Sequence, residues 1–130
     1  MCGINGYILN NKPTRSNLIS LMNDKIIHRG PDDDGVHKDV ISNKYIGLGM
    51  RRLSIIDLST GKQPMFSEDE SVVIVFNGEI YNYKALKSKL IEQHNVIFNS
   101  TSDTEVILRM YEIYGVESFS RLDGMFAFSI

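Results

Sequence analysis

The sequence predicts an α+β fold, in which helices and strands share one hydrophobic core. Residues 72–76 form a continuous run of β-branched and aromatic residues that is typical of a buried strand. Residues 103–114 carry apolar side chains at helical spacing, directly after a capping signal. A length of 130 residues and a hydrophobic content of 42% suit one core. We therefore expect one domain, or part of one.

The N-terminal part is predicted to contain a strand followed by a helix. Residues 3–9 favour a short strand, and the Asn-Asn-Lys-Pro sequence at 10–13 ends it. Apolar residues then recur at helical spacing and predict a helix over 16–27, with Thr14 or Ser16 as its N-cap. The residues at this spacing are Leu18, Leu21, Met22 and Ile26.

A glycine and a proline end this helix, and an acidic run follows. Gly30 permits a left-handed turn, and Pro31 cannot continue a helix. The Asp-Asp-Asp-Gly sequence at 32–35 has some of the character of a calcium loop, but the required ligand spacing fails at Val36. We therefore expect a turn there.

Residues 45–56 are predicted to be extended, with two arginines inside the strand. Apolar residues alternate here with Gly47 and Gly49. Neighbouring residues of a strand point to opposite faces, so only one of Arg51 and Arg52 can face a given pocket. The alternative is that both arginines are solvated.

Asn77 and Gly78 directly follow the strand at 72–76. An Asn-Gly pair between apolar runs signals a hairpin turn, because both residues tolerate a positive φ. The same pair offers a side-chain amide and an unshielded backbone N–H, the two kinds of donor that an oxyanion hole uses. The pattern alone favours the turn.

The remaining sequence predicts further helices and strands. Ser102 and Glu105 are spaced as a capping box, and Asp103 between them would complement the helix dipole. The chain stops inside an apolar run, which would leave an aggregation-prone edge, so we expect a domain truncated at its C-terminal side. The predicted elements are a helix over 84–93, a strand over 96–98, a helix over 103–114, a turn or short helix over 116–122 and a strand over 125–130.

Charge and composition argue against several kinds of function. The formal net charge is −2 and the basic residues are dispersed, so we expect no binding to nucleic acid or to an anionic membrane. One cysteine and three scattered histidines do not suit a metal site, and no intrachain disulfide can form. With no signal peptide or long apolar run, the protein is expected to be cytoplasmic, with a small-molecule or protein partner.

The single cysteine, Cys2, directly follows the initiator methionine. Removal of Met1 would give one residue both a thiol nucleophile and an α-amine that can act as its base. The alternative for a lone cysteine is a small buried hydrophobe, which is the more common case.

Seven sequence blocks are distributed along nearly the whole chain. They are Met-Cys-Gly-Ile (1–4), His-Arg-Gly-Pro-Asp (28–32), Arg-Leu-Ser-Ile-Ile-Asp (52–57), Gln-Pro-Met (63–65), Phe-Asn-Gly-Glu-Ile-Tyr-Asn (76–82), Ser-Asp-Thr-Glu (102–105) and Leu-Asp-Gly-Met-Phe-Ala-Phe (122–128). In their order and spacing they resemble the class II glutamine amidotransferase domains that open glutamine-hydrolysing asparagine synthetases. Sugar-phosphate and purine-pathway amidotransferases share the N-terminal Cys and an Asn-Gly pair, but their other blocks look different.

The resemblance implies an N-terminal-nucleophile hydrolase fold, which is a four-layer αββα sandwich of antiparallel sheets, with residues 1–130 as its N-terminal part. It implies that Cys2 attacks the side-chain amide of glutamine, with its own α-amine as proton carrier. Ammonia leaves, and water hydrolyses the thioester to glutamate. The Asn77 side chain and the Gly78 N–H would stabilise the oxyanion.

The resemblance also implies how glutamine would be recognised. Arg52 would pair with the α-carboxylate, and Asp103, with help from Glu79, would bind the α-ammonium group. The backbone that would line the same pocket is that of Leu53, Ser54, Ile55 and Ile56.

The expected partners follow from the same family. In its full-length members the ammonia passes to a synthetase domain that uses ATP and Mg, and nothing in this chain resembles that domain. We therefore expect L-glutamine as substrate, no cofactor in this chain, and the synthetase domain as partner, while a homodimer remains open. Two alternatives are a glutaminase that supplies another ammonia acceptor and a non-catalytic domain that binds glutamine or a partner.

Overall fold

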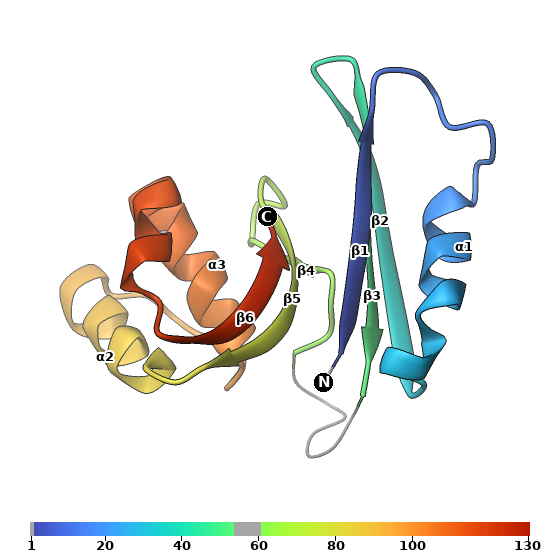
Figure 1. Ribbon diagram of the computed structural model, residues 1–130. Coiled ribbons are helices and arrows are strands. Elements are labelled where there is room, and N and C mark those ends of the chain that lie inside the picture. The colour runs from blue at the N-terminus through green and yellow to red at the C-terminus, as the bar shows by residue number, and fades with distance from the viewer. Residues whose placement is uncertain (1, 54–60) are drawn as a thin grey trace.

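The structure is a computed structural model that describes residues 2–53 and 61–130. Within these ranges the chain forms two three-stranded antiparallel sheets and three α-helices. Figure 1 shows the sheets facing each other, with one helix outside the first sheet and two outside the second. This arrangement is compatible with the αββα sandwich. Among residues 2–53 and 61–130, none of the helices has the length and apolar character of a membrane span.

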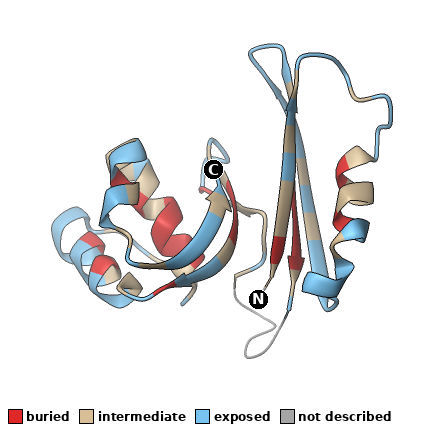
Figure 2. Ribbon diagram, viewed as in Figure 1, coloured by how far each residue is buried: buried red, intermediate tan, exposed pale blue. Residues whose placement is uncertain are grey.

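The N-terminal half builds the first sheet. Its strands β1 (Gly3–Leu9), β3 (Lys44–Arg52) and β2 (Asp33–Ile41) lie side by side in that order. The helix α1 (Leu18–Lys25) and a 3₁₀ turn, η1 (Ile27–Arg29), connect β1 to β2. The central strand β3 holds most of the buried residues of this sheet (Figure 2).

A buried polar side chain joins α1 to all three strands. Asn23 is 1% exposed and donates to the backbone carbonyls of Gly35 and Met50, both at 3.1 Å. Its Oδ1 accepts from the Asn5 side chain at 2.6 Å. Gly49 leaves the space for this amide, because a Cβ there would collide with the Asn23 oxygen. Helical periodicity did not mark Asn23 as a core position.

The C-terminal half builds the second sheet and covers its outer face with helices. Its elements are β4 (Met65–Phe66), β5 (Val73–Ile80), α2 (Tyr83–His94), α3 (Asp103–Tyr114), the 3₁₀ helix η2 (Gly115–Arg121) and β6 (Gly124–Ser129), with the strands in the order β4-β5-β6. The main core consists of Ile74, Phe76 and Ile80 packed with residues such as Leu90 of α2 and Ile107 of α3. Figure 2 shows buried stretches on β5 and on the helices that cover it.

The opposite face of β5 packs on the first sheet. Val75 is fully buried and contacts Leu48 and Met50 of β3. Because β5 contributes side chains to both cores, the predicted burial of the 72–76 run on both faces is confirmed.

The structure confirms the predicted strands at 3–9 and 125–130, the helices at 84–93 and 103–114 and the short helix near 116–122, with small shifts of their ends. The first helix is shorter than expected. Its N-cap position is Asn17, without a side-chain capping bond, where the sequence predicted Thr14 or Ser16. Caps of this kind depend on how the preceding loop approaches the helix, which apolar spacing does not specify.

The expected turn at 32–35 is wrong. Residues 33–35 are the first residues of β2, with Asp34 opposite Arg51 of β3. The strand is polar and mostly exposed, so it carries no alternation by which it could be found. Residues 33–41 form a strand because they pair with β3.

The strand predicted over 96–98 is also wrong, because these residues form no regular element. The chain leaves α2 through Asn95, which has a left-handed conformation. Val96 and Phe98 then pack against the main core, while Ile97 is 76% exposed. The alternation therefore reflects a loop that covers the core.

The capping box of α3 is only half formed. The Ser102 hydroxyl accepts from the Thr104 N–H at 3.1 Å, as predicted. Glu105, 4% exposed, instead accepts from the backbone N–H groups of Asn99 at 2.9 Å and Ser100 at 2.7 Å. The Glu105 carboxylate therefore anchors the preceding loop to the helix.

We predict that Glu105→Ala lowers the free energy of unfolding by about 1.5–3 kcal/mol, because the two loop N–H groups lose a charged acceptor. Urea unfolding measures this change. Glu112→Ala is the matched control, since Glu112 also pairs with Arg109 but is exposed. Its effect should stay below about 1 kcal/mol. Equal losses in both variants would contradict the anchoring role.

Candidate functional site

A pocket of about 220 Å³ lies where β1 begins, β3 ends and α3 begins. Cys2, Arg52, Gly78 and Asp103, four of the residues predicted for the site, line it. They come from four separate segments of the sequence. The other lining residues are Gly61, Gln63, Phe76, Ser102 and Thr104.

Strand pairing brings Cys2 to Arg52. The antiparallel register of β1 and β3 places Gly3 opposite Arg51. Cys2, one residue before β1, therefore lies near the C-terminal end of β3, where Arg52 is located. The side chain of Cys2 is neither fully buried nor fully exposed.

The two arginines have different surroundings, as expected for neighbours on a strand. Arg51 is 8% exposed and forms an ion pair with Asp34 of β2 at 3.5 Å. Arg52 lines the pocket. Strand alternation alone left open which arginine faces a site, and the family resemblance implied Arg52. Arg52 is the one that lines this pocket.

The loop after η1 supports the end of β3. The N–H of Asp32 donates to the Arg52 carbonyl at 3.1 Å, and Pro31 forms an isolated bridge with Arg52. A Cβ on Gly30 would collide with the backbone of Arg51 and Arg52. The block at 28–32 therefore has a structural reason for its glycine: it must pass close to β3.

Asn77 and Gly78 do not form the hairpin turn that their pattern favoured. They continue β5, with Gly78 opposite Phe126 of β6. Gly78 has φ +150°, and a Cβ there would collide with the Met125 carbonyl. The glycine is thus required by a close approach of two strands, which the sequence pattern does not distinguish from a turn.

One edge of β5 faces the pocket. The Phe76 N–H donates to the Gln63 side-chain oxygen at 2.6 Å, and the Ile80 N–H donates to the Asp103 carboxylate at 3.0 Å. N–H groups of a strand alternate between its two edges, so the N–H of Gly78 faces the same edge, between these two bonds. Gly78 therefore presents a backbone donor towards the pocket.

The Asn77 side chain lies on the face of β5 opposite to that of the Phe76 side chain. Alternation places its side chain with Val75, on the face that packs against the first sheet. Its Oδ1 is buried and has no hydrogen-bond partner among the described residues. A buried amide oxygen without a partner is uncommon, so this side chain has unused capacity for a polar contact with a ligand.

Asp103 carries a carboxylate in a partly buried position at the pocket. Burial raises the pKa of the Asp103 carboxyl above its ordinary value of 3.8, and the charge of Glu79 raises it further. Hydrogen bonds from the backbone N–H groups of Ile80 and Thr104 lower the pKa, but burial has the larger effect. Because the carboxylate loses solvation there, a cationic group of a ligand would compensate it.

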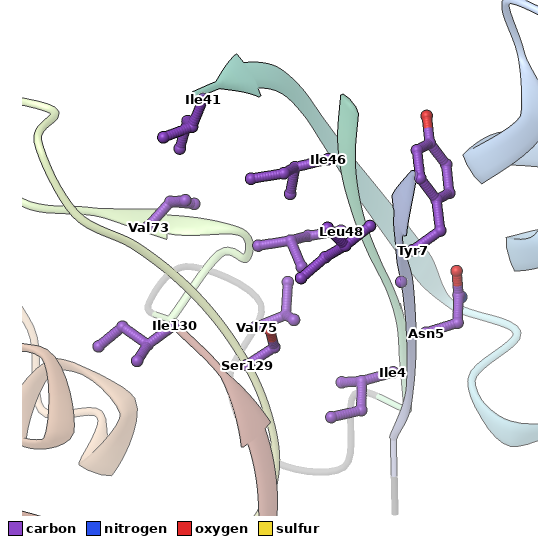
Figure 3. Close-up of a pocket in the computed structure, with 12 residues that line it drawn as sticks. Ile4, Asn5, Tyr7, Ile41, Ile46, Leu48, Val73, Val75, Ser129 and Ile130 are labelled. Atoms are coloured by element: carbon purple, nitrogen blue, oxygen red, sulfur yellow. The ribbon is translucent and has the colours of Figure 1, made fainter. Parts of the chain in front are cut away.

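A second pocket of about 470 Å³ lies between the two sheets (Figure 3). Ile46 and Leu48 of β3 face Val73 and Val75 of β5 across it (Figure 3). It is larger but mostly apolar, and it contains no charged side chain and none of the predicted site residues. The smaller pocket therefore holds the groups that can bind a charged ligand.

Comparison with known proteins identifies the family. The family described as "Glutamine amidotransferase domain" matches residues 1–130. The chain belongs to this family. It is 48% identical to asparagine synthetase [glutamine-hydrolyzing] 1 of Bacillus subtilis, over 100% of this chain and 20% of that protein. It is 45% identical to asparagine synthetase [glutamine-hydrolyzing] 2 of Arabidopsis thaliana, over 98% of this chain and 21% of that protein.

A third relative, the putative asparagine synthetase [glutamine-hydrolyzing] 2 of Methanocaldococcus jannaschii, is 43% identical over 100% of this chain and 27% of its own length. The chain thus spans between a fifth and just over a quarter of the length of these relatives. The resemblance to amidotransferase domains noted in the sequence is confirmed.

The pocket of about 220 Å³ does not contain every predicted residue. Three of the predicted site residues that the structure describes are not part of its lining, namely Leu53, Asn77 and Glu79. Glu79 still influences Asp103 through its charge. The predicted Ser54, Ile55 and Ile56 lie outside the described residues.

The structure adds lining residues that the sequence reasoning did not assign. Ser102 and Thr104 flank Asp103, and Gln63 belongs to the Gln-Pro-Met block. All three residues belong to the sequence blocks shared with the family. That membership could have marked them as site residues, but it did not indicate a role for any of them. No group of three or more potential metal ligands occurs within residues 2–53 and 61–130.

We predict that Asp103→Asn raises the free energy of unfolding relative to wild type at about pH 7, and raises it less at about pH 3. An acid whose pKa is raised by folding stabilises the folded state most below pH 3.8, and this contribution falls as the pH rises through 3.8 towards the raised value. The amide keeps an acceptor for the Ile80 N–H without a buried charge.

Urea unfolding of both proteins at the two pH values measures the effect. Asp24→Asn, at an exposed position of α1, is the control and should show a smaller dependence on pH. A wild-type advantage that grows from pH 3 to pH 7 would contradict the prediction.

Proposed function

We propose that this chain hydrolyses the side-chain amide of glutamine to glutamate and ammonia, with Cys2 as nucleophile. The observation that carries the proposal is the pocket that collects Cys2, Arg52, Gly78 and Asp103. A thiol, a cation, a backbone N–H donor and an anion are the groups needed to attack an amide in a free amino acid. Membership of the glutamine amidotransferase domain family supports the same reaction.

The charges would select free glutamine. The Arg52 guanidinium would bind the α-carboxylate, and Asp103 would bind the α-ammonium group with electrostatic help from Glu79. A glutamine inside a peptide carries neither charge. The volume of about 220 Å³ is below the range of drug-sized sites and suits a small metabolite.

The first half of the reaction would form a thioester. With Met1 removed, the Cys2 α-amine takes the thiol proton and the sulfur attacks the side-chain amide carbon. The Gly78 N–H would stabilise the oxyanion from the edge of β5. The Asn77 side-chain N–H would be the second donor, because its side chain lies on the face of β5 towards the first sheet, whose strand β1 begins directly after Cys2. The C–N bond then breaks, the ammonium of Cys2 returns the proton to the leaving nitrogen, and ammonia departs.

Water would complete the cycle. The α-amine takes a proton from water as the hydroxide oxygen attacks the thioester carbon. A second oxyanion forms on the same donors, the C–S bond breaks, and glutamate leaves as the proton returns to the thiolate. All of these steps use this chain's own groups and water, so the proposed reaction requires no cofactor in this chain.

The relatives suggest the larger context. Their names describe glutamine-hydrolysing asparagine synthetases, so we propose that ammonia from this domain serves asparagine synthesis in a longer protein, where a separate ATP- and Mg-dependent domain activates aspartate. A different ammonia acceptor is the alternative, because an acceptor site would belong to that other domain.

The intact mass before and after treatment with an electrophilic glutamine analogue tests the proposal. We expect a chain without Met1, one covalent adduct on Cys2, and protection by free glutamine. Cys2→Ala should still bind glutamine by calorimetry but release no ammonia, because the nucleophile is removed while Arg52 and Asp103 remain. Turnover by Cys2→Ala would refute the nucleophile. A processed chain that binds glutamine but forms no adduct would indicate the non-catalytic alternative.

Asn77→Ala is expected to raise the barrier by about 2.7–4 kcal/mol, seen as a roughly 10²–10³-fold loss of kcat, because one oxyanion donor is lost. Ammonia release as a function of glutamine concentration measures it. Asn11→Ala, at an exposed position after β1, is the control and should leave kcat unchanged. A loss confined to KM would show that Asn77 binds glutamine without stabilising the oxyanion.

A further inference from the structure

We propose that Gln63 is a positioning residue of this site, which holds the strand that carries Gly78 against the helix turn that carries Asp103. The inference rests on the proposed glutaminase function and extends it to a residue outside the predicted site. Gln63 lines the same pocket as Cys2.

The Gln63 side chain joins two elements at once. Its Oε1 accepts from the Phe76 N–H of β5 at 2.6 Å, and its Nε2 donates to the Thr104 hydroxyl of α3 at 3.3 Å. Thr104 is 2% exposed and directly follows Asp103. One amide therefore sets the distance between β5 and the first turn of α3.

The side chain replaces a missing ladder bond. In the pairing of β4 with β5, Met65 lies opposite Ile74, and continuing this register would place the backbone of Gln63 opposite Phe76. The backbone of Gln63 is instead turned towards β2, where its carbonyl contacts Gly35 so closely that a Cβ on Gly35 would collide with it. The side-chain carbonyl takes over the Phe76 N–H.

This bond orients the proposed oxyanion donor. The N–H groups of Phe76 and Ile80, two residues before and two after Gly78, are held by Gln63 and Asp103. The Gly78 N–H faces the same edge between them. A shift of β5 at Phe76 would therefore rotate the Gly78 donor, whereas a shift of α3 at Thr104 would move the Asp103 carboxylate.

Loss of both hydrogen bonds of Gln63 should therefore have a different kinetic effect from loss of the bond to Thr104 alone. Gln63→Met keeps the length of the side chain and removes both hydrogen bonds, so it should lower kcat and raise KM, with a roughly ten- to hundredfold loss of kcat/KM. Thr104→Val removes only the acceptor on α3. It should raise KM about two- to tenfold, the effect of one neutral hydrogen bond, with little change in kcat.

The test uses the full chain and measures glutamine hydrolysis per active site, with sites counted by reaction with the electrophilic analogue. Thr104→Ser should restore the wild-type KM, because serine keeps the hydroxyl. Gln93→Met, the same substitution at an exposed position of α2, should match wild type. A residue with only a structural role would reduce the number of reactive sites and leave kcat and KM per site unchanged.

The outcomes separate the two proposals. A wild-type chain that neither reacts with the analogue nor releases ammonia overturns the glutaminase function itself. An active wild type with unchanged kcat and KM per site in Gln63→Met overturns the positioning role alone. If Gln63→Met yields too little folded protein, the Thr104→Val and Thr104→Ser pair decides, and equal KM values in both would overturn the role.

Discussion

The register between β1 and β3 is the constraint on which the site depends. It places Gly3 opposite Arg51, and hence Cys2 near Arg52, although Cys2 and Arg52 are 50 positions apart in the sequence. A shift of one residue would exchange the faces of every side chain on β1. The buried Asn23 amide opposes such a shift, because its hydrogen bonds to Asn5, Gly35 and Met50 fit one alignment of α1 with the sheet.

In the second sheet, side chains near the pocket take the place of a neighbouring strand at one edge of β5. β4 is only two residues long, so it leaves part of the edge of β5 without a backbone partner. Gln63 and Asp103 bind the N–H groups of Phe76 and Ile80 there. Buried backbone N–H groups need acceptors, and these two bonds supply them on either side of the Gly78 N–H. The same bonds therefore serve both the fold and the geometry of the pocket.

Local patterns predicted the elements that have a strong periodicity, such as the strand that becomes β5 and the helix α3. They failed where a partner determines the structure. β2 is polar and gains its hydrogen bonds from β3, and the Asn77–Gly78 pair is held in an extended form by β6. Residues 96–98 have the pattern of a strand but cover the core as a loop.

The order and spacing of the sequence blocks are specific enough to identify the family without a structure, and the resemblance pointed to Cys2, Arg52, Gly78 and Asp103 as groups of one site. The three-dimensional arrangement shows that these four groups line a common pocket, that the Gln63 side chain bonds Phe76 and Thr104 beside them, and that the Asn77 side chain lies on the face of β5 towards the first sheet. The reason is physical. Residue types and spacings record which chemistry is available, whereas the distances between these groups depend on strand register and on hydrogen bonds between segments far apart in the chain.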